Sequence, residues 1–139
     1  LFYCADWHSE SVLGQPRADF ISPTQAAREA GLMFSTHHDA PVALPSSLRV
    51  LDATVNRTTR TNKILGKDQR VDQYTTLRAM TAWPAHQYFE EGRKGSLSAG
   101  KQADLVILTA NPLKIPRKDL INLAVVKTIS RGKTVYQRD

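Results

Sequence analysis

The pattern of apolar and polar residues divides the chain into two parts. Residues 1–92 alternate short strand and helix signals, whereas residues 93–139 contain strand signals separated by turns. The clearest strand signal of the first part is the apolar run 32–36, which is typical of a buried strand. A second strand is predicted over residues 1–3, where the sequence opens with apolar side chains. We therefore expect an α/β protein.

A helix is predicted directly before the run 32–36. Ser22 is a candidate N-cap, and Pro23 suits the first helical position because its missing N–H would have no partner there. Residues 25–30 have high helix propensity, and Gly31 can end the helix with a positive φ. A helix, a glycine and a buried strand in this order form half of a βαβ unit, which favours a parallel sheet.

Two further helices are predicted before the end of the first part. Ser46 or Ser47 can cap one of them, and Asp72 can cap the other, which Pro84 breaks or restarts. Each carries an apolar face at helical spacing: Leu48, Leu51 and Val55 in the first, and Tyr74, Leu77 and Met80 in the second. We expect both helices to pack through these faces.

The second part of the chain is predicted to be built of strands. Residues 104–108 form one strand signal, and residues 124–129 and 133–136 form two more around Arg131 and Gly132. This arrangement is typical of a β-hairpin. We place the boundary between two structural units at residues 92 and 93.

Length and charge exclude several classes of protein. With 139 residues the chain is too short for a complete (β/α)₈ barrel, which needs roughly 250. It has no apolar run approaching the ~18 residues of a membrane span.

The net charge of +6 is dispersed, so we expect neither a nucleic-acid nor a membrane partner. The densest basic group is predicted to be a solvated helix face and loop: Arg57, Arg60, Lys63, Lys67 and Arg70. The single cysteine, Cys4, excludes an internal disulfide and is predicted to be a small buried side chain.

The sharpest candidate for chemistry is the sequence His37-His38-Asp39-Ala40-Pro41. It follows the predicted strand 32–36, and catalytic groups of α/β proteins lie at the carboxyl ends of strands. In an extended segment His37 and Asp39 share a face and His38 opposes them. His37 is then the better partner for Asp39 in a site, and His38 packs or lines a wall. The alternative is that these side chains only cap backbone groups.

A weaker candidate is Asp6-Trp7-His8, in which Asp6 and His8 are predicted to share a face. A histidine beside an aromatic residue is more often structural than catalytic. The residues alone leave both interpretations open.

The chain resembles the metal-dependent amidohydrolases in three stretches. Residues 95–108, Gly-Ser-Leu-Ser-Ala-Gly-Lys-Gln-Ala-Asp-Leu-Val-Ile-Leu, are similar to the stretch where these enzymes return from their barrel to a small β-sandwich. Residues 38–42 resemble the end of the eighth barrel strand, and residues 77–85 the helical region between the two. Asp6-Trp7-His8 with Val12-Leu13-Gly14 resembles the amidohydrolase family 3 branch, which includes N-substituted formamide deformylases.

The resemblance implies a fold and an activity. Residues 1–92 would form the last strands and helices of a (β/α)₈ TIM-type barrel, and residues 93–139 part of a C-terminal β-sandwich. The enzyme would use water activated by a divalent metal, zinc being expected, to hydrolyse a non-peptide amide or other C–N bond of a small molecule. Asp39 matches the aspartate that binds the metal or transfers the proton. His8, His37 and His38 are our candidates for substrate binding.

The chain departs from the family pattern because it has no His-X-His motif for the metal. We therefore expect it to be the C-terminal fragment of a larger, cytoplasmic enzyme and to be inactive alone. Its exposed sheet edges would be covered by the rest of the barrel or by another chain. The alternative is a non-catalytic binding or assembly module on the same scaffold.

Overall fold

The two longest helices form where the sequence supplies both a cap and an apolar face. Helix α3, Ser47–Asn56, begins where the Ser46 hydroxyl accepts a hydrogen bond from the Arg49 N–H at 3.3 Å. Helix α4, Gln73–Met80, begins where an Asp72 carboxylate oxygen accepts one from the Thr75 N–H at 2.7 Å. Both predicted helices and their caps are therefore confirmed. Each cap satisfies a backbone N–H in the first turn that has no partner within the helix.

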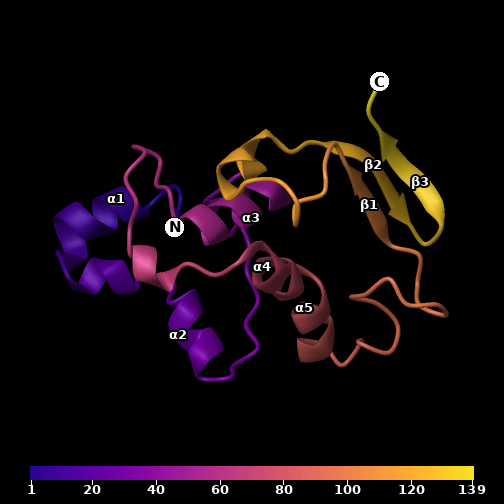
Figure 1. Ribbon diagram of the computed structural model, residues 1–139, viewed down its shortest axis with the longest axis horizontal. Helices are drawn as coiled ribbons and strands as arrows, with labels where there is room; N and C mark the ends of the chain where they lie inside the picture. The colour runs from indigo at the N-terminus through magenta and orange to yellow at the C-terminus, as the bar shows by residue number, and fades with distance from the viewer.

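The computed structural model describes all 139 residues and shows an elongated molecule, with helices at one end and a small sheet at the other (Figure 1). Besides α3 and α4, its helical elements are α1 Ala5–Trp7, the π-helix His8–Leu13, α2 Thr24–Glu29, α5 Ala82–Gln87, and 3₁₀ turns at Arg17–Phe20, Lys67–Gln69 and Arg117–Asn122. The predicted helix before Gly31 is therefore confirmed, and Gly31 ends it with a φ of +71°. Ser22 does not cap it: Pro23 occupies that position without a side-chain bond.

The sheet has three antiparallel strands in the order β1-β2-β3, with the bounds β1 Leu105–Leu108, β2 Val125–Ser130 and β3 Lys133–Gln137. Val106 lies opposite Thr128, which in turn lies opposite Tyr136. Arg131 and Gly132 connect β2 and β3 with φ values of +49° and +78°, and positive φ at both positions is what a type I′ hairpin turn requires. The predicted strand and hairpin are confirmed.

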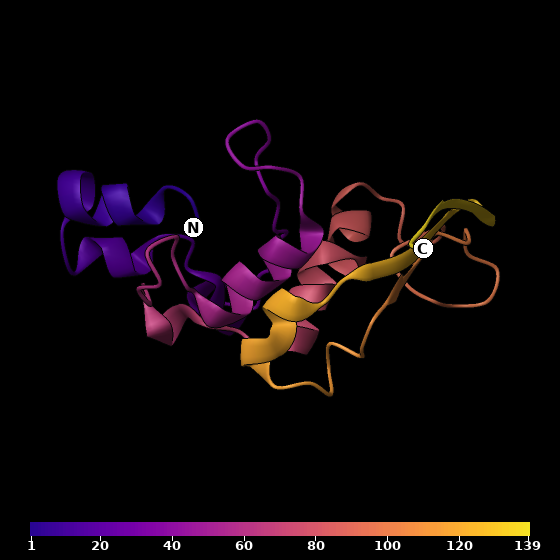
Figure 2. The same ribbon diagram turned by 90° about the horizontal axis from the view of Figure 1, so that it is seen from above.

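The main core lies where α3 packs against α4 and the 3₁₀ turn Arg117–Asn122, between the two ends of the molecule (Figure 2). Its buried members are Leu51, Val55, Leu120 and Leu123. A second, smaller cluster holds the N-terminal helices together and consists of Ala5, Ala18 and Leu65. No helix is both long enough and apolar enough to cross a bilayer.

The two predicted strands of the first part do not form, and neither does a parallel sheet within this chain. Residues 2–4 make a turn that leads into α1. Residues 32–38 are extended but pair with no other strand. The Thr36 N–H donates to the carbonyl of Ala79, a residue of helix α4, at 3.2 Å. A strand exists only when a neighbour pairs with it, and the apolar pattern does not reveal whether this chain supplies that neighbour.

The predicted solvated basic face is also wrong at Arg57, and Arg70 is half-buried, with its Nε donating to the Asn56 carbonyl at 3.0 Å. The Arg57 side chain is only 1% exposed, because three backbone carbonyls surround its guanidinium group. Arg60, Lys63 and Lys67 are exposed as expected.

Candidate active site

A cavity of about 760 Å³ lies between the N-terminal helices, the extended segment and one side of α3. All four predicted site residues line it: His8, His37, His38 and Asp39. They come from two parts of the chain that are separated by about thirty positions in the sequence, and the structure brings both parts to the same cavity. Their chemical roles stay predictions.

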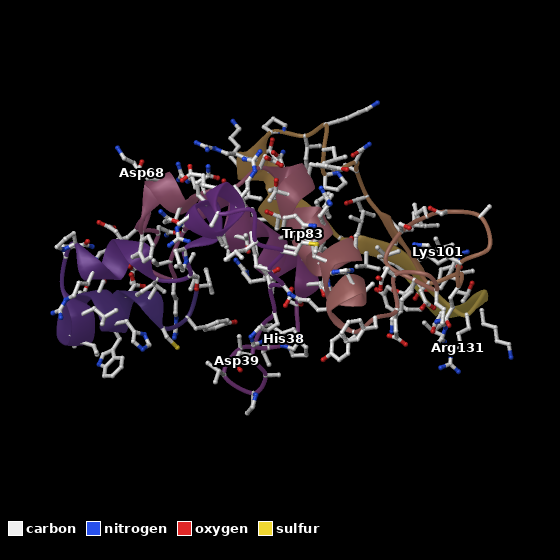
Figure 3. The ribbon with its side chains drawn as sticks, turned by 90° about the horizontal axis from the view of Figure 1, so that it is seen from below. His38, Asp39, Asp68, Trp83, Lys101 and Arg131 are labelled. Atoms are coloured by element: carbon white, nitrogen blue, oxygen red, sulfur yellow. The ribbon has the colours of Figure 1, made fainter.

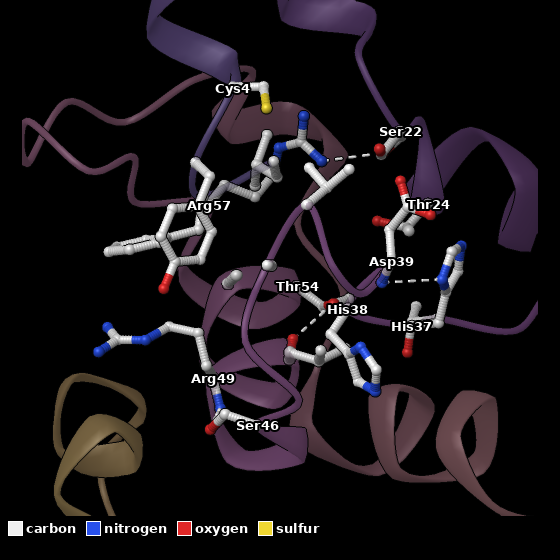
Figure 4. A pocket seen from close by; sticks show the side chains of 18 of the residues that line it. Cys4, Ser22, Thr24, His37, His38, Asp39, Ser46, Arg49, Thr54 and Arg57 are labelled. Carbon is white, nitrogen blue, oxygen red and sulfur yellow. Dashed lines mark hydrogen bonds between the residues drawn. The ribbon is translucent and has the colours of Figure 1, made fainter.

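The backbone around Asp39 is fixed on both sides. The Asp39 N–H donates to His37 Nδ1 at 3.0 Å (Figure 4), and the Asp39 carbonyl accepts from the Val42 N–H at 2.8 Å. The φ of Asp39 is +60°, a left-handed conformation that aspartate and asparagine tolerate better than most residues. Asp39 thus lies at the start of a turn on a loop that projects from the body (Figure 3).

The carboxylate of Asp39 has no hydrogen-bond or ion-pair partner in the chain, although it lies on the cavity wall. Most of the other carboxylates in the chain accept a hydrogen bond or form an ion pair; Asp72, for example, caps α4. The side chain of Asp39 is therefore free to interact with a molecule in the cavity.

Both adjacent histidines accept a backbone hydrogen bond at Nδ1. The partner is the Asp39 N–H for His37 and the Ala40 N–H for His38, at 3.2 Å in the second case. A neutral ring that accepts at Nδ1 carries its hydrogen on Nε2 and can donate from that atom. Metal ligation through Nε2 would instead need a lone pair there, so this geometry suits substrate binding.

The exposure of the segment alternates as an extended chain should. Phe34, Thr36 and His38 are half-buried, whereas His37 and Asp39 are exposed. This agrees with the expectation that His37 and Asp39 share a face that His38 opposes.

The weaker candidate, Asp6-Trp7-His8, is arranged differently from our expectation. His8 Nδ1 lies 2.7 Å from the Cys4 carbonyl, and its ring meets Trp7 edge-on at 5.1 Å. Asp6 does not lie on the same face as His8, because this stretch is helical and residues two apart on a helix point in different directions. Cys4 is half-buried on the cavity wall rather than fully buried.

Asp6 instead secures the loop after α3. Its carboxylate accepts hydrogen bonds from the hydroxyls of Thr59 at 2.7 Å and Thr61 at 2.9 Å, and from the Thr61 N–H. Burial acts to raise the pKa of Asp6, but these hydrogen bonds outweigh it and hold the pKa below its ordinary value. Asp6 therefore has a structural role.

The chain does not by itself assemble a metal centre. No three histidine, cysteine, aspartate or glutamate side chains gather where they could hold one ion. A catalytic zinc usually needs about three protein ligands. Asp39 is the only member of the candidate site that offers a free carboxylate.

The sequence did not indicate that two arginines lie on the cavity wall: Arg49 was not a candidate, and Arg57 was expected on a solvated face. Arg49 and Arg57 lie on α3 and at its end, and both line the cavity. The signal that could have found them is their spacing: positions 49, 53 and 57 follow each other at i+4 and form a second face beside the apolar one.

Comparisons with known proteins agree with the resemblance seen in the sequence. A family model described as "Amidohydrolase family" matches residues 1–136. An N-substituted formamide deformylase from Arthrobacter pascens is 30% identical over 118 residues, which are 85% of this chain and 22% of that protein. The crystal structure of an amidohydrolase from Thermotoga maritima MSB8 superposes with a TM-score of 0.63 at 20% identity, covering 83% of this chain and 26% of that one.

The chain thus spans about a quarter or less of the length of these two relatives. The solved structure is too distant in sequence to inform on more than the fold. The match of the family model over nearly the whole chain decides the relationship: this chain belongs to the amidohydrolase family.

Proposed function

We propose that this chain forms part of the active site of a metal-dependent hydrolase that cleaves non-peptide amide or other C–N bonds. In this proposal residues 1–92 belong to a (β/α)₈ barrel and residues 93–139 to a small β-domain packed beside it. The family membership and the cavity that joins the four candidate residues support it. An N-substituted formamide is the first substrate to test, since a relative is named for that activity.

The observation that carries the proposal is the free carboxylate of Asp39 on a rigid turn in the cavity. An ionised carboxylate can take a proton from the attacking water and then deliver it to the nitrogen of the leaving amine. The bonds to His37 and Val42 keep its backbone in place while it does so. Such a fixed acid–base group needs no rearrangement during the reaction.

His37 and His38 would bind the substrate. Their Nε2–H groups can donate to the carbonyl oxygen of an amide, while their Nδ1 atoms stay occupied by the backbone. His8 is placed to contact the same molecule from the N-terminal side of the cavity.

The family relationship implies a divalent metal, and zinc is the ion that we expect. Asp39 would be one ligand, but this chain lacks the further ligands that a zinc site needs. The longer relatives have room for those ligands in the three quarters of their length that this chain does not match.

The test uses the intact, zinc-loaded protein and N-benzylformamide, with release of formate as the readout. Asp39→Asn should lower kcat by roughly 10²–10⁴-fold, because it removes the acid–base group. Asparagine tolerates the positive φ at this position, so the turn should survive. Asp68→Asn, on an exposed turn far from the cavity, is the matched control and should keep wild-type activity (Figure 3).

Removing the metal with a chelator should abolish hydrolysis, and added zinc should restore it. Retention of activity by Asp39→Asn or by the chelated protein would contradict the proposal. A zinc-loaded protein that hydrolyses no amide or formamide would favour the alternative of a binding module.

A further inference from the structure

The two arginines on the cavity wall differ in how their charge is satisfied. The Arg57 guanidinium group donates to the carbonyls of Leu65, Ser22 and Ile21 at distances of 2.6–2.9 Å. All three of its nitrogen atoms are therefore used within the chain. Arg57 is a structural residue, because it is buried and its charge is satisfied by these three carbonyls.

The guanidinium group of Arg49 has no hydrogen-bond acceptor and no carboxylate partner in the chain. Only the backbone N–H of Arg49 is engaged, by the Ser46 hydroxyl. Its one side-chain contact of note is the Phe2 ring, over which it lies with 4.4 Å between Cζ and the ring centroid. Stacking on an aromatic face leaves the N–H groups at the edge of the guanidinium plane free to donate.

Arg49 also lies away from the candidate acid–base group. Figure 4 shows it on the opposite side of the view from Asp39 and His37, and the two charged groups are not paired. Apolar side chains line the same cavity, among them Phe2, Val50 and Leu44. The cavity therefore has an apolar wall, a carboxylate at one side and an unpaired guanidinium at another.

We propose that Arg49 is a specificity-determining residue that selects substrates carrying a carboxylate at the end remote from the scissile C–N bond. The substrate class is an amide or formamide with an apolar body and a terminal carboxylate. A guanidinium fork and a carboxylate match in shape and can form two parallel hydrogen bonds. The stack on Phe2 holds the fork in position before the substrate arrives, which lowers the entropic cost of binding.

This inference rests on the proposed function, because it names the substrates of the same site. It assigns Arg49 to binding, so the effect belongs in KM for one kind of substrate. An arginine that only stabilised α3 or acted on Asp39 would instead alter all substrates alike.

The kinetic test compares two substrates of the intact enzyme, N-(4-carboxybenzyl)formamide and its neutral isostere N-(4-carbamoylbenzyl)formamide. Arg49→Met should raise KM for the carboxylate by about ten- to a hundredfold and leave the neutral substrate within about twofold. Arg49→Lys keeps the charge without the fork and should recover part of the loss. Arg138→Met, at an exposed arginine outside the cavity, is the control and should change neither substrate.

A binding measurement separates this inference from the proposed function, since it needs no turnover. Calorimetry should show that 4-methylbenzoate binds the wild type more tightly than 4-methylbenzamide, and that Arg49→Met removes the difference. If this holds while no formamide is hydrolysed, the specificity stands and the proposed function fails. If the wild type does not prefer the charged member of either pair, or if Arg49→Met affects both substrates equally, the role of Arg49 is overturned.

Discussion

At the scale of single residues, Arg57 and Gly66 hold together the region beside the cavity. Burial lowers the pKa of Arg57 to about 10, so its side chain is still cationic at neutral pH. Its charge-assisted bonds to Ile21, Ser22 and Leu65 tie the segment before α2 and the loop before residue 66 to the end of α3. Gly66 is the neighbour that lets these segments approach closely.

Gly66→Ala should destabilise the protein strongly. The φ of Gly66 is +59°, and a Cβ there would lie 1.9 Å from the carbonyl oxygen of Asp19 and 3.1 Å from Nη2 of Arg57. We expect a loss of about 2–5 kcal/mol in the free energy of unfolding, from overpacking against backbone together with strain at φ. Urea unfolding of the intact protein measures it.

Gly132→Ala is the matched control for this substitution. Gly132 also has a positive φ, +78°, but nothing lies within 4 Å of the added Cβ. Gly132→Ala should lower the free energy of unfolding only by the backbone strain, about 1–2 kcal/mol. Equal losses for the two variants would show that the close approach at Gly66 contributes nothing.

At the scale of elements, the sequence predicts what local chemistry decides. The caps at Ser46 and Asp72 and the turn at Arg131–Gly132 involve residues a few positions apart, and all three are found as expected. The strand expected at residues 32–36 depends on a neighbour that the local pattern does not specify.

The candidate site also has a part that the sequence predicts and a part that it does not. His37, His38 and Asp39 stand together in the sequence and were recognisable as a group. The burial of Arg57 depends on carbonyls 35 and 36 positions away, and no local pattern of charges contains that information. The unpaired state of Arg49 likewise becomes visible only when every possible acceptor has been placed.

The cap of α4 predicts a specific dependence of stability on pH. Burial acts to raise the pKa of Asp72, but hydrogen bonds from Thr75 and the charge of Arg28 hold it below its usual 3.8. The ionised cap therefore stabilises the fold above pH 3.8, and this contribution is lost as the pH falls through the lowered pKa of the folded state. Asp72→Asn keeps an oxygen for capping but does not titrate.

The free energy of unfolding of the wild type should thus exceed that of the Asp72→Asn variant at pH 6, by up to about 1 kcal/mol. This difference between the two proteins should shrink by pH 3. Denaturant titrations at the two pH values measure it. A difference that is constant or grows on acidification would contradict this account of the cap.

At the scale of the whole molecule, this chain exposes more surface than a compact protein of its size. Its accessible surface is 9110 Å², whereas a compact monomer of this length exposes about 7,200 Å². Large apolar side chains are exposed on the extended segment, at Leu32 and Met33, and on the sheet, at Val106 and Val135. The large accessible surface and these exposed apolar side chains are expected of surfaces that pack against further protein.

The extended segment provides the most direct test of this prediction. Of the amides of residues 32–38, only those of Leu32 and Thr36 donate to a backbone carbonyl in this chain, and neither acceptor belongs to a strand. If neighbouring strands in the intact protein pair with the segment, the amides of Met33, Ser35 and His37 on one edge, or of Phe34 and His38 on the other, gain acceptors. Hydrogen exchange followed by NMR should then show these amides protected by roughly a hundredfold or more in the intact protein relative to the 139-residue chain alone. The amides of β2 that already pair with β1 serve as the internal reference, because their partners lie within the chain. Exchange at residues 32–38 that is as fast in the intact protein as in the isolated chain would mean that the segment is an uncovered loop, and the assignment of residues 1–92 to a barrel would fail with it.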